Sequence, residues 1–171
     1  MILIVSTCKE DLHMLEFVRP IMDIIGKDCI VRRYDELINE DIDNCDKIII
    51  AGTSLQDNDV LRFDLEFIRT TRKPILGICA GMQCIGRAFN LSLYENPEIG
   101  FYDENFDEEF LGLKGKQNVY HLHNYSVDFN NSEFIEYVKG QAVKHNRKEI
   151  FGVLFHPEVR QKEMIKKFIG L

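Results

Sequence analysis

The stretch that decides the fold is KPILGICAGMQCIGR, residues Lys73–Arg87. It starts as an apolar strand, Pro74–Ile78, and continues with the apolar spacing of a helix over Ala80–Phe89. A tight turn between such a strand and helix holds a cysteine above the end of the sheet, and the helix N-terminus favours its thiolate. The pattern therefore predicts that Cys79 is a nucleophile. The backbone N–H of Ala80, next in the chain, is a candidate oxyanion donor.

The remainder of the first half of the chain repeats this alternation of strand and helix. Apolar, β-branched runs predict buried strands, and apolar residues spaced three or four apart predict helices. The order predicts an α/β fold with an open, mostly parallel sheet flanked by helices. The predicted strands are Met1–Ser6, Cys29–Arg33, Asp46–Ala51 and Pro74–Ile78, and the predicted helices are Lys9–Gly26 (with a kink or break at Pro20), Asp57–Arg69 and Ala80–Phe89.

The second half of the chain has a different pattern. The segment Glu95–Glu109 holds seven acidic residues and no Lys or Arg, which predicts a loop or edge segment that faces water. Three strands are predicted after it, and an amphipathic helix closes the chain. These strands are Val119–Asp128, Glu136–Val143 and Ile150–Phe155, and the helix is Arg160–Leu171.

Length and composition exclude several classes of protein. The 171 residues predict a single domain spanning residues 1–171. A formal net charge of −7 argues against binding nucleic acid or an anionic membrane. The first residues, MILIVSTCKEDLH, lack the basic start of a signal peptide. The five cysteines are odd in number and form no CxxC pair, so we expect no disulfide framework and a cytoplasmic location.

A nucleophilic cysteine needs a base, and His156 is the best candidate among the five histidines. It ends the apolar run of the last strand, where open α/β sheets place their sites, and Glu158 can orient its ring. His13 and His145 are predicted on the surface. His121 and His123 share one face of a strand, but no further cluster with ligand spacing accompanies them, so no metal site is predicted.

Two motifs carry a resemblance that covers nearly the whole chain. GICAGMQ around Cys79 and FGVLFHPEV around His156 resemble the two signatures of class I glutamine amidotransferase domains, which have a flavodoxin-like fold. The resemblance implies that Cys79 attacks the side-chain amide of glutamine, that His156 transfers the proton, and that Glu158 orients His156. It implies no cofactor.

The resemblance also implies further site residues. The oxyanion would be held by the N–H of Ala80 and by one from the Gly52 loop. Gln83 matches a position that helps to hold glutamine. His123, Asn124 and Tyr125 belong to the strand segment whose backbone receives the α-amino and α-carboxylate groups. The Gly52 loop departs from the family, because Thr53 and Ser54 stand where family members are richer in glycine.

The resemblance leaves three functions open. The chain carries no P-loop or GxGxxG pattern for an acceptor, so the first is a glutaminase that delivers ammonia to a separate synthase subunit. The sequence resembles small subunits of this kind, such as those of GMP synthase and imidazole glycerol phosphate synthase. The second is a free-standing γ-glutamyl hydrolase or amidase. The third is a non-catalytic, glutaminase-like regulatory subunit.

Overall fold

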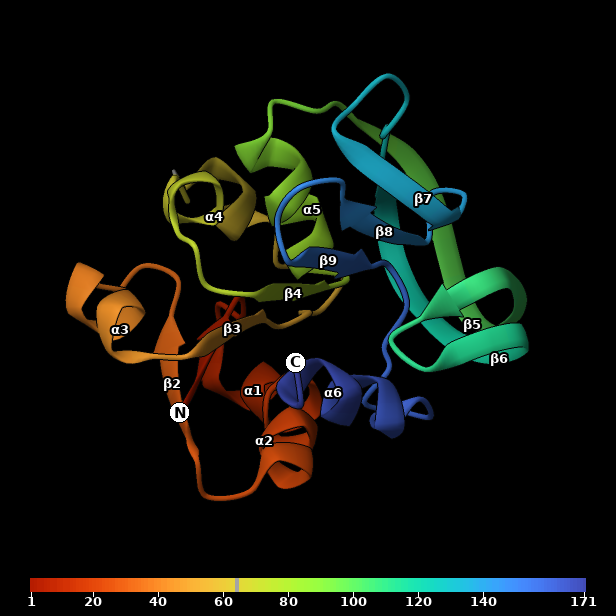
Figure 1. Ribbon diagram of the computed structural model, residues 1–171. Helices are drawn as coiled ribbons and strands as arrows, with labels where there is room; N and C mark the ends of the chain where they lie inside the picture. Colours follow the sequence, from red (N-terminus) through yellow and green to blue (C-terminus); the bar gives the residue numbers. More distant parts are fainter. Residues whose placement is uncertain (64) are drawn as a thin grey trace.

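A large mixed sheet forms the centre of the computed structural model, which describes residues 1–63 and 65–171 (Figure 1). In the described residues this sheet has seven strands, in the order β2-β1-β3-β4-β9-β8-β7. The first five run parallel, and β8 and β7 are antiparallel to their neighbours. In spatial order the strands are Cys29–Arg33, Ile2–Ser6, Lys47–Ile50, Ile75–Ile78, Ile150–Val153, Ala142–His145 and Phe134–Val138.

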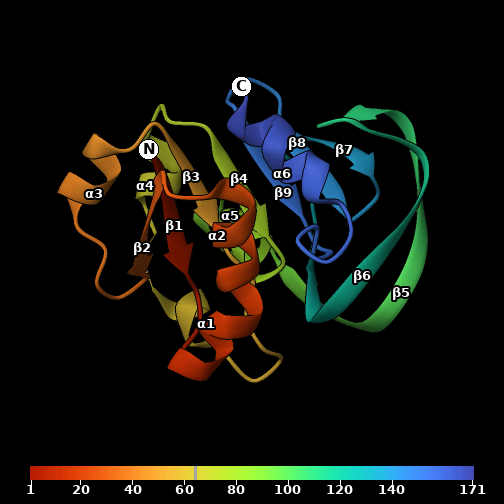
Figure 2. The same ribbon diagram turned by 90° about the horizontal axis from the view of Figure 1, so that it is seen from below.

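Helices cover both faces of the sheet and create two apolar cores. Strand β1 contributes alternate residues to each, with Ile2 and Ile4 in one core and Leu3 and Val5 in the other, which is why the run is apolar throughout. Figure 2 shows α2 and α6 on the near face. That face carries α1 (Asp11–Phe17), α2 (Arg19–Ile25) and α6 (Lys162–Ile169), and the other carries α3 (Asn39–Asn44), α4 (Phe67–Thr70) and α5 (Ala80–Ala88).

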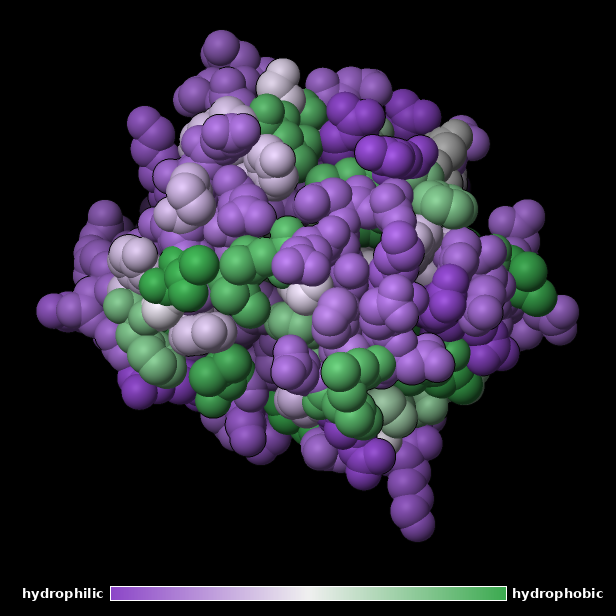
Figure 3. All heavy atoms as spheres, turned by 180° about the vertical axis from the view of Figure 1, so that it is seen from behind, coloured by the Kyte–Doolittle hydropathy of each residue, from purple (hydrophilic) through white to green (hydrophobic). Residues whose placement is uncertain are grey.

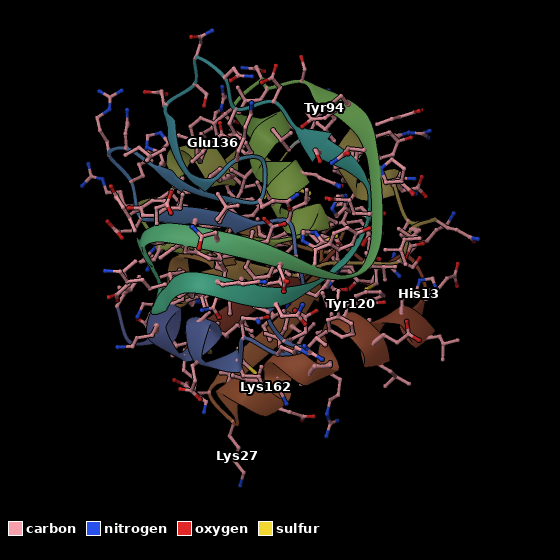
Figure 4. The ribbon with its side chains drawn as sticks, turned by 90° about the vertical axis from the view of Figure 1, so that its right-hand side faces the viewer. His13, Lys27, Tyr94, Tyr120, Glu136 and Lys162 are labelled. Atoms are coloured by element: carbon pink, nitrogen blue, oxygen red, sulfur yellow. The ribbon has the colours of Figure 1, made fainter. Side chains whose placement is uncertain are left out.

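A two-stranded arm stands apart from the sheet. Its strands are β5 (Leu93–Phe110) and β6 (Leu113–Val127), paired antiparallel. Figure 4 views the arm face-on, with Tyr94 near one end and Tyr120 on the side of the helix that carries His13. The turn end of the arm packs into the core through Phe106 and Phe110.

The predicted α/β fold with a mostly parallel sheet is confirmed, and several element boundaries are corrected. The predicted break in the helix over Lys9–Gly26 is confirmed, because α1 and α2 are separate helices; Pro20 lies in the first turn of α2, where its missing N–H costs nothing. The helix predicted over Asp57–Arg69 is a 3-10 turn, Asp59–Arg62, followed by the short α4; Asp64 within it lies outside the described residues.

In the second half, the strand predicted over Glu136–Val143 is two strands, because Gly140 turns the chain with a φ of +69°. Of the two alternatives for the acidic segment Glu95–Glu109, the edge segment is confirmed: it forms most of the largely exposed strand β5 of a two-stranded sheet, although Phe106 within it is buried. Among the described residues, no helix combines the length and the apolar character needed to cross a membrane.

Candidate active site

Cys79 sits at a strained turn between β4 and α5. Its φ of +51° and ψ of −107° are unfavourable for a residue with a β-carbon, and such strain is typical of functional sites. The flanking glycines permit the turn. A β-carbon on Gly81 would lie 2.1 Å from the carbonyl oxygen of Ile50, and one on Gly77 would lie 2.6 Å from the backbone of Gly81. The GxCxG spacing is therefore required for α5 to pack onto β3 and β4.

His156 and Glu158 form a buried pair directly after β9. His156 Nδ1 lies 2.7 Å from Glu158 Oε1, and the His156 backbone N–H donates to the carbonyl of Tyr120 at 2.8 Å. Burial lowers the pKa of His156, but the negative charges of Glu158 and Cys79 outweigh it and hold that pKa well above its ordinary value. The raised pKa of His156 therefore favours its protonated, imidazolium form.

In this conformation the Cys79 thiol donates to a backbone carbonyl, although its side chain lies close enough to His156 to influence the pKa of that ring. Cys79 Sγ donates to the carbonyl oxygen of Leu122 at 3.4 Å, while His156 Nε2 is buried with no hydrogen-bond partner in the described part of the chain. Both groups thus keep a free position for a reacting molecule.

Gly52, the predicted oxyanion glycine, touches both reactive residues. A β-carbon placed on it would lie 2.6 Å from Cε1 of His156 and 3.2 Å from Cβ of Cys79. Real β-carbons do not approach other atoms so closely, so any other residue would force the histidine ring or the cysteine to move. Glycine is required here for steric reasons. A turn that merely ended the strand would not exclude a β-carbon in this way.

The loop after Gly52 is fixed to helix α1 by a buried carboxylate. Asp57 Oδ2 accepts from Thr53 Oγ1 at 2.8 Å and from the Lys9 backbone N–H at 3.1 Å, and it lies 2.7 Å from His13 Nδ1. Burial raises the pKa of Asp57, but hydrogen bonds from His13 and Thr53 outweigh it and lower that pKa below its ordinary value. Sequence reasoning missed this network, and it explains why threonine occupies the loop.

The predicted substrate residues line one small cleft with Cys79. Gln83 donates through Nε2 to the carbonyl of Tyr125 at 2.8 Å, and Asn124 donates through Nδ2 to the carbonyl of Leu55 at 3.1 Å. His123 lines the same small cleft. The structure thus brings the predicted substrate residues together beside Cys79, and the Asn124–Leu55 bond joins two walls of the cleft.

One prediction about an individual residue is wrong, and a second cysteine near the site is deeply buried. His145 was predicted on the surface, which is wrong: the residue is 2% exposed and its ring packs against Phe89 and Phe134. The polar residues that flank His145 in the sequence led to the prediction of a surface position. Cys84 lies one turn beyond Cys79 in α5, and burial raises the pKa of its thiol to about 12.

The paired histidines of β6 have a third partner that the sequence did not reveal. Glu98 on β5 faces His123 across the arm, and its Oε2 lies 3.0 Å from His123 Nε2. His121 Nδ1 lies 3.2 Å from the same His123 nitrogen. The expectation that no further ligand accompanies the pair is therefore corrected.

Comparison with known proteins agrees with this geometry. The sequence profile of the family described as "Glutamine amidotransferase class-I" matches residues 19–170. The chain is 31% identical over 164 residues to the glutamine-hydrolysing subunit of GMP synthase from Sulfolobus acidocaldarius, covering 86% of this chain and 87% of the relative. It is 31% identical over 137 residues to the protein of the same name in Methanothermobacter thermautotrophicus, covering 73% and 70%.

A solved structure shows the same fold. The crystal structure of a Thermoplasma acidophilum protein, described as a candidate subunit of GMP synthase, superposes with a TM-score of 0.85 at 23% identity, covering 99% of this chain and 92% of that one. Three observations point to the same family: the matching fold, the family profile and the turn around Cys79. This chain belongs to the class I glutamine amidotransferase family.

Proposed function

We propose that this chain hydrolyses the side-chain amide of glutamine at Cys79 and delivers the ammonia to a separate synthase subunit. The observation that carries the proposal is the Cys79 elbow, which lies beside the buried His156–Glu158 pair at the carboxyl ends of the parallel strands. The family of the chain and the names of its relatives support it.

The proposed reaction starts with attack by the Cys79 thiolate on the amide carbon of glutamine. The new S–C bond gives a tetrahedral intermediate with a negatively charged oxygen. His156 then gives its Nε2 proton to the amide nitrogen, and the C–N bond breaks to release ammonia and leave a thioester. Water attacks the thioester while neutral His156 takes up its proton, and the C–S bond breaks to release glutamate and regenerate the Cys79 thiolate and the imidazolium. The free Nε2 position of His156 suits both transfers.

Two backbone groups are proposed to hold the oxyanion. Ala80 is the first residue of α5, so its N–H has no partner within the helix. The second donor comes from the peptide between Gly52 and Thr53. Because the Gly52 carbonyl accepts from the Cys8 thiol at 3.8 Å, the trans peptide turns the N–H of Thr53 away from Cys8.

The remaining site residues are proposed to position glutamine. Gln83 fixes the carbonyl of Tyr125, and so holds the segment His123–Tyr125 at a set distance from the nucleophile. The backbone of that segment would receive the α-amino and α-carboxylate groups. The side chains of Gln83 and Asn124 act here through the backbone they hold.

The Asn124–Leu55 bond at the cleft supports dependence on a partner. Because this bond joins two walls of the small cleft beside Cys79, we propose that the loop containing Leu55 moves when glutamine binds. A partner that stabilises the open loop raises the population of competent enzyme. We propose the synthetase subunit of a GMP synthase as that partner, since the similar relatives are named as the glutamine-hydrolysing subunit of this enzyme.

Steady-state glutaminase kinetics test the proposal. The purified chain is assayed alone, with the separately encoded GMP synthase synthetase subunit of the same organism, and with that subunit plus its nucleotide substrates. We expect a slow glutaminase alone and a rise in kcat of about tenfold or more in the full mixture, with GMP formed from glutamine nitrogen. Full activity in the isolated chain would favour the free-standing hydrolase, and no glutamine hydrolysis in any mixture would favour the regulatory role.

A further inference from the structure

The arm brings three metal-binding side chains together outside the proposed triad. Glu98 lies on β5, and His121 and His123 lie two residues apart on β6, so both rings point to the same face. The two histidine side chains have no exposed surface, and Glu98 is only 20% exposed. The antiparallel pairing of β5 with β6 brings the three side chains together, because it places Glu98 directly opposite His123.

The spacing of the three donor atoms matches a tetrahedral metal site. The distances are 3.2 Å from His121 Nδ1 to His123 Nε2, 3.0 Å from His123 Nε2 to Glu98 Oε2, and 3.8 Å from His121 Nδ1 to Glu98 Oε2. Zinc bonds of about 2.0–2.1 Å at tetrahedral angles place neighbouring ligand atoms about 3.3 Å apart. The triangle therefore has the size that one Zn²⁺ ion requires.

Hydrogen bonding alone satisfies this triangle poorly. Each ring nitrogen carries at most one proton, so a His123 Nε2–H that donates to Glu98 leaves His121 Nδ1 without a well-directed hydrogen bond within the triangle. Such groups are costly to bury without partners. A cation at the centre would accept electron pairs from all three atoms at once.

The surroundings provide two groups that suit a metal site. Behind the triangle, the outer nitrogen of His121 faces a carboxylate: His121 Nε2 lies 3.4 Å from Glu104 Oε1, without a hydrogen bond in this conformation. Gln141 donates through Nε2 to Glu98 Oε2 at 2.9 Å. Ligand histidines usually donate their second N–H to a carboxylate, and ligand carboxylates are in turn hydrogen-bonded.

We propose that Glu98, His121 and His123 bind one Zn²⁺ ion. Two imidazoles and a carboxylate are ligands that suit Zn²⁺, and in a different geometry they also suit Fe²⁺. Mg²⁺ and Ca²⁺ prefer oxygen ligands alone. The ion cross-links β5 to β6 beside Leu122, whose carbonyl accepts from the Cys79 thiol. Metal binding thus sets the position of the strand that faces the nucleophile.

Metal titration of the whole chain tests this site. Chelator-treated protein is titrated calorimetrically with Zn²⁺ in a Cys79→Ala background, so that the nucleophile cannot supply a ligand. We expect one ion per chain and a rise in the melting temperature on binding. Anaerobic titration with Fe²⁺ should show weaker binding, and tighter binding of Fe²⁺ would overturn the assignment to zinc.

Three variants and a matched control locate the ion. Glu98→Gln and His121→Gln should weaken Zn²⁺ binding more than about 100-fold, and Glu104→Gln by about tenfold or more. Glu95→Gln changes an exposed carboxylate on the same strand and should bind Zn²⁺ as tightly as the parent. Circular dichroism confirms that each variant is folded. No binding by the parent protein, or unchanged binding by Glu98→Gln, would overturn the proposal.

Discussion

Gly52 and His156 are in direct contact, and a β-carbon on the glycine would lie 2.6 Å from Cε1 of the imidazole. We therefore predict that Gly52→Ala displaces the histidine ring and lowers glutaminase kcat by about 100-fold or more, since a misplacement of about 1 Å can cost this much. Gly170→Ala is the control, because a β-carbon there meets only ordinary contacts at 3.5 Å. Equal activity of the two variants would show that the contact does not hold the ring.

Cys79, and not Cys84, should be the nucleophile. An electrophilic glutamine analogue should label Cys79 alone, as mapped by peptide mass spectrometry, and Cys79→Ala should abolish glutaminase activity. Cys84 is 2% exposed and its thiol has a pKa of about 12, so it stays protonated and shielded at any ordinary assay pH. Labelling of Cys84, or activity in Cys79→Ala, would contradict the assignment.

Glu158 should control the pH dependence of the reaction. Its negative charge raises the pKa of His156, so Glu158→Gln should lower that pKa and move the alkaline limb of kcat/KM to lower pH. The variant keeps the size of the side chain, and we expect a smaller loss of kcat than the several powers of ten for His156→Ala. An unchanged alkaline limb would mean that another group sets it.

The bond from Asn124 to Leu55 should limit access to the thiol. Asn124→Ala removes this closure, so iodoacetamide, which needs no glutamine recognition, should alkylate Cys79 several-fold faster. Asn118→Ala is the matched control on the same strand, since its side chain bonds to Asp103 instead. Equal alkylation rates for the two variants would place the closure elsewhere.

His145 should make the fold sensitive to mild acid. Burial lowers its pKa, and Nδ1 accepts the backbone N–H groups of Arg147 and Lys148, which a protonated ring cannot do. In the unfolded chain the histidine has its ordinary pKa of about 6.5, so as the pH falls it takes up a proton before the folded chain does. The free energy of unfolding therefore decreases as the pH falls from about 6.5 through the lower pKa of His145 in the folded chain. His145→Asn keeps an acceptor that does not titrate.

Urea unfolding between pH 8 and pH 5 measures this contribution. The wild type should lose more free energy of unfolding across this range than His145→Asn does. The comparison uses the slope of the free energy of unfolding against pH. A difference in stability between the two proteins that does not change with pH therefore does not affect it. Identical slopes would show that His145 is not the sensitive group.

The parts of this site that could be predicted from the sequence are those set by local backbone. The GxCxG turn and the His-Pro-Glu segment each carry their geometry within a few residues, so the elbow at Cys79 and the pairing of His156 with Glu158 were both predicted. The structure shows both. The roles of these residues in the reaction stay predictions.

The parts that could not be predicted depend on long-range register. An irregularity in the pairing between Glu95 and Glu98 shifts β5, so counting along the acidic segment does not place Glu98 opposite His123. The link from Thr53 through Asp57 to His13 joins a loop to a helix far away in the sequence. The prediction of a single domain over residues 1–171 remains untested.

The molecular surface carries scattered exposed hydrophobic side chains, including two on the arm. The face of the molecule opposite to Figure 1 is mostly hydrophilic, with small separate hydrophobic patches (Figure 3). On β5, Ile99 and Phe101 are 59% and 50% exposed, on the strand that carries Glu98. Scattered exposure of this kind is ordinary for a folded chain, and it carries no conclusion on its own.

The pairing of β4 with β9 fixes when activity can arise during synthesis. Ile75 is hydrogen-bonded into register with Ile150, and the whole arm lies between them in the chain, whereas β5 and β6 pair locally. A nascent chain can therefore form the hairpin early, but its cysteine waits without a base until β9 emerges and docks. Only then do His156 and Glu158 reach the thiol, so we expect an incomplete polypeptide that lacks β9 not to hydrolyse glutamine.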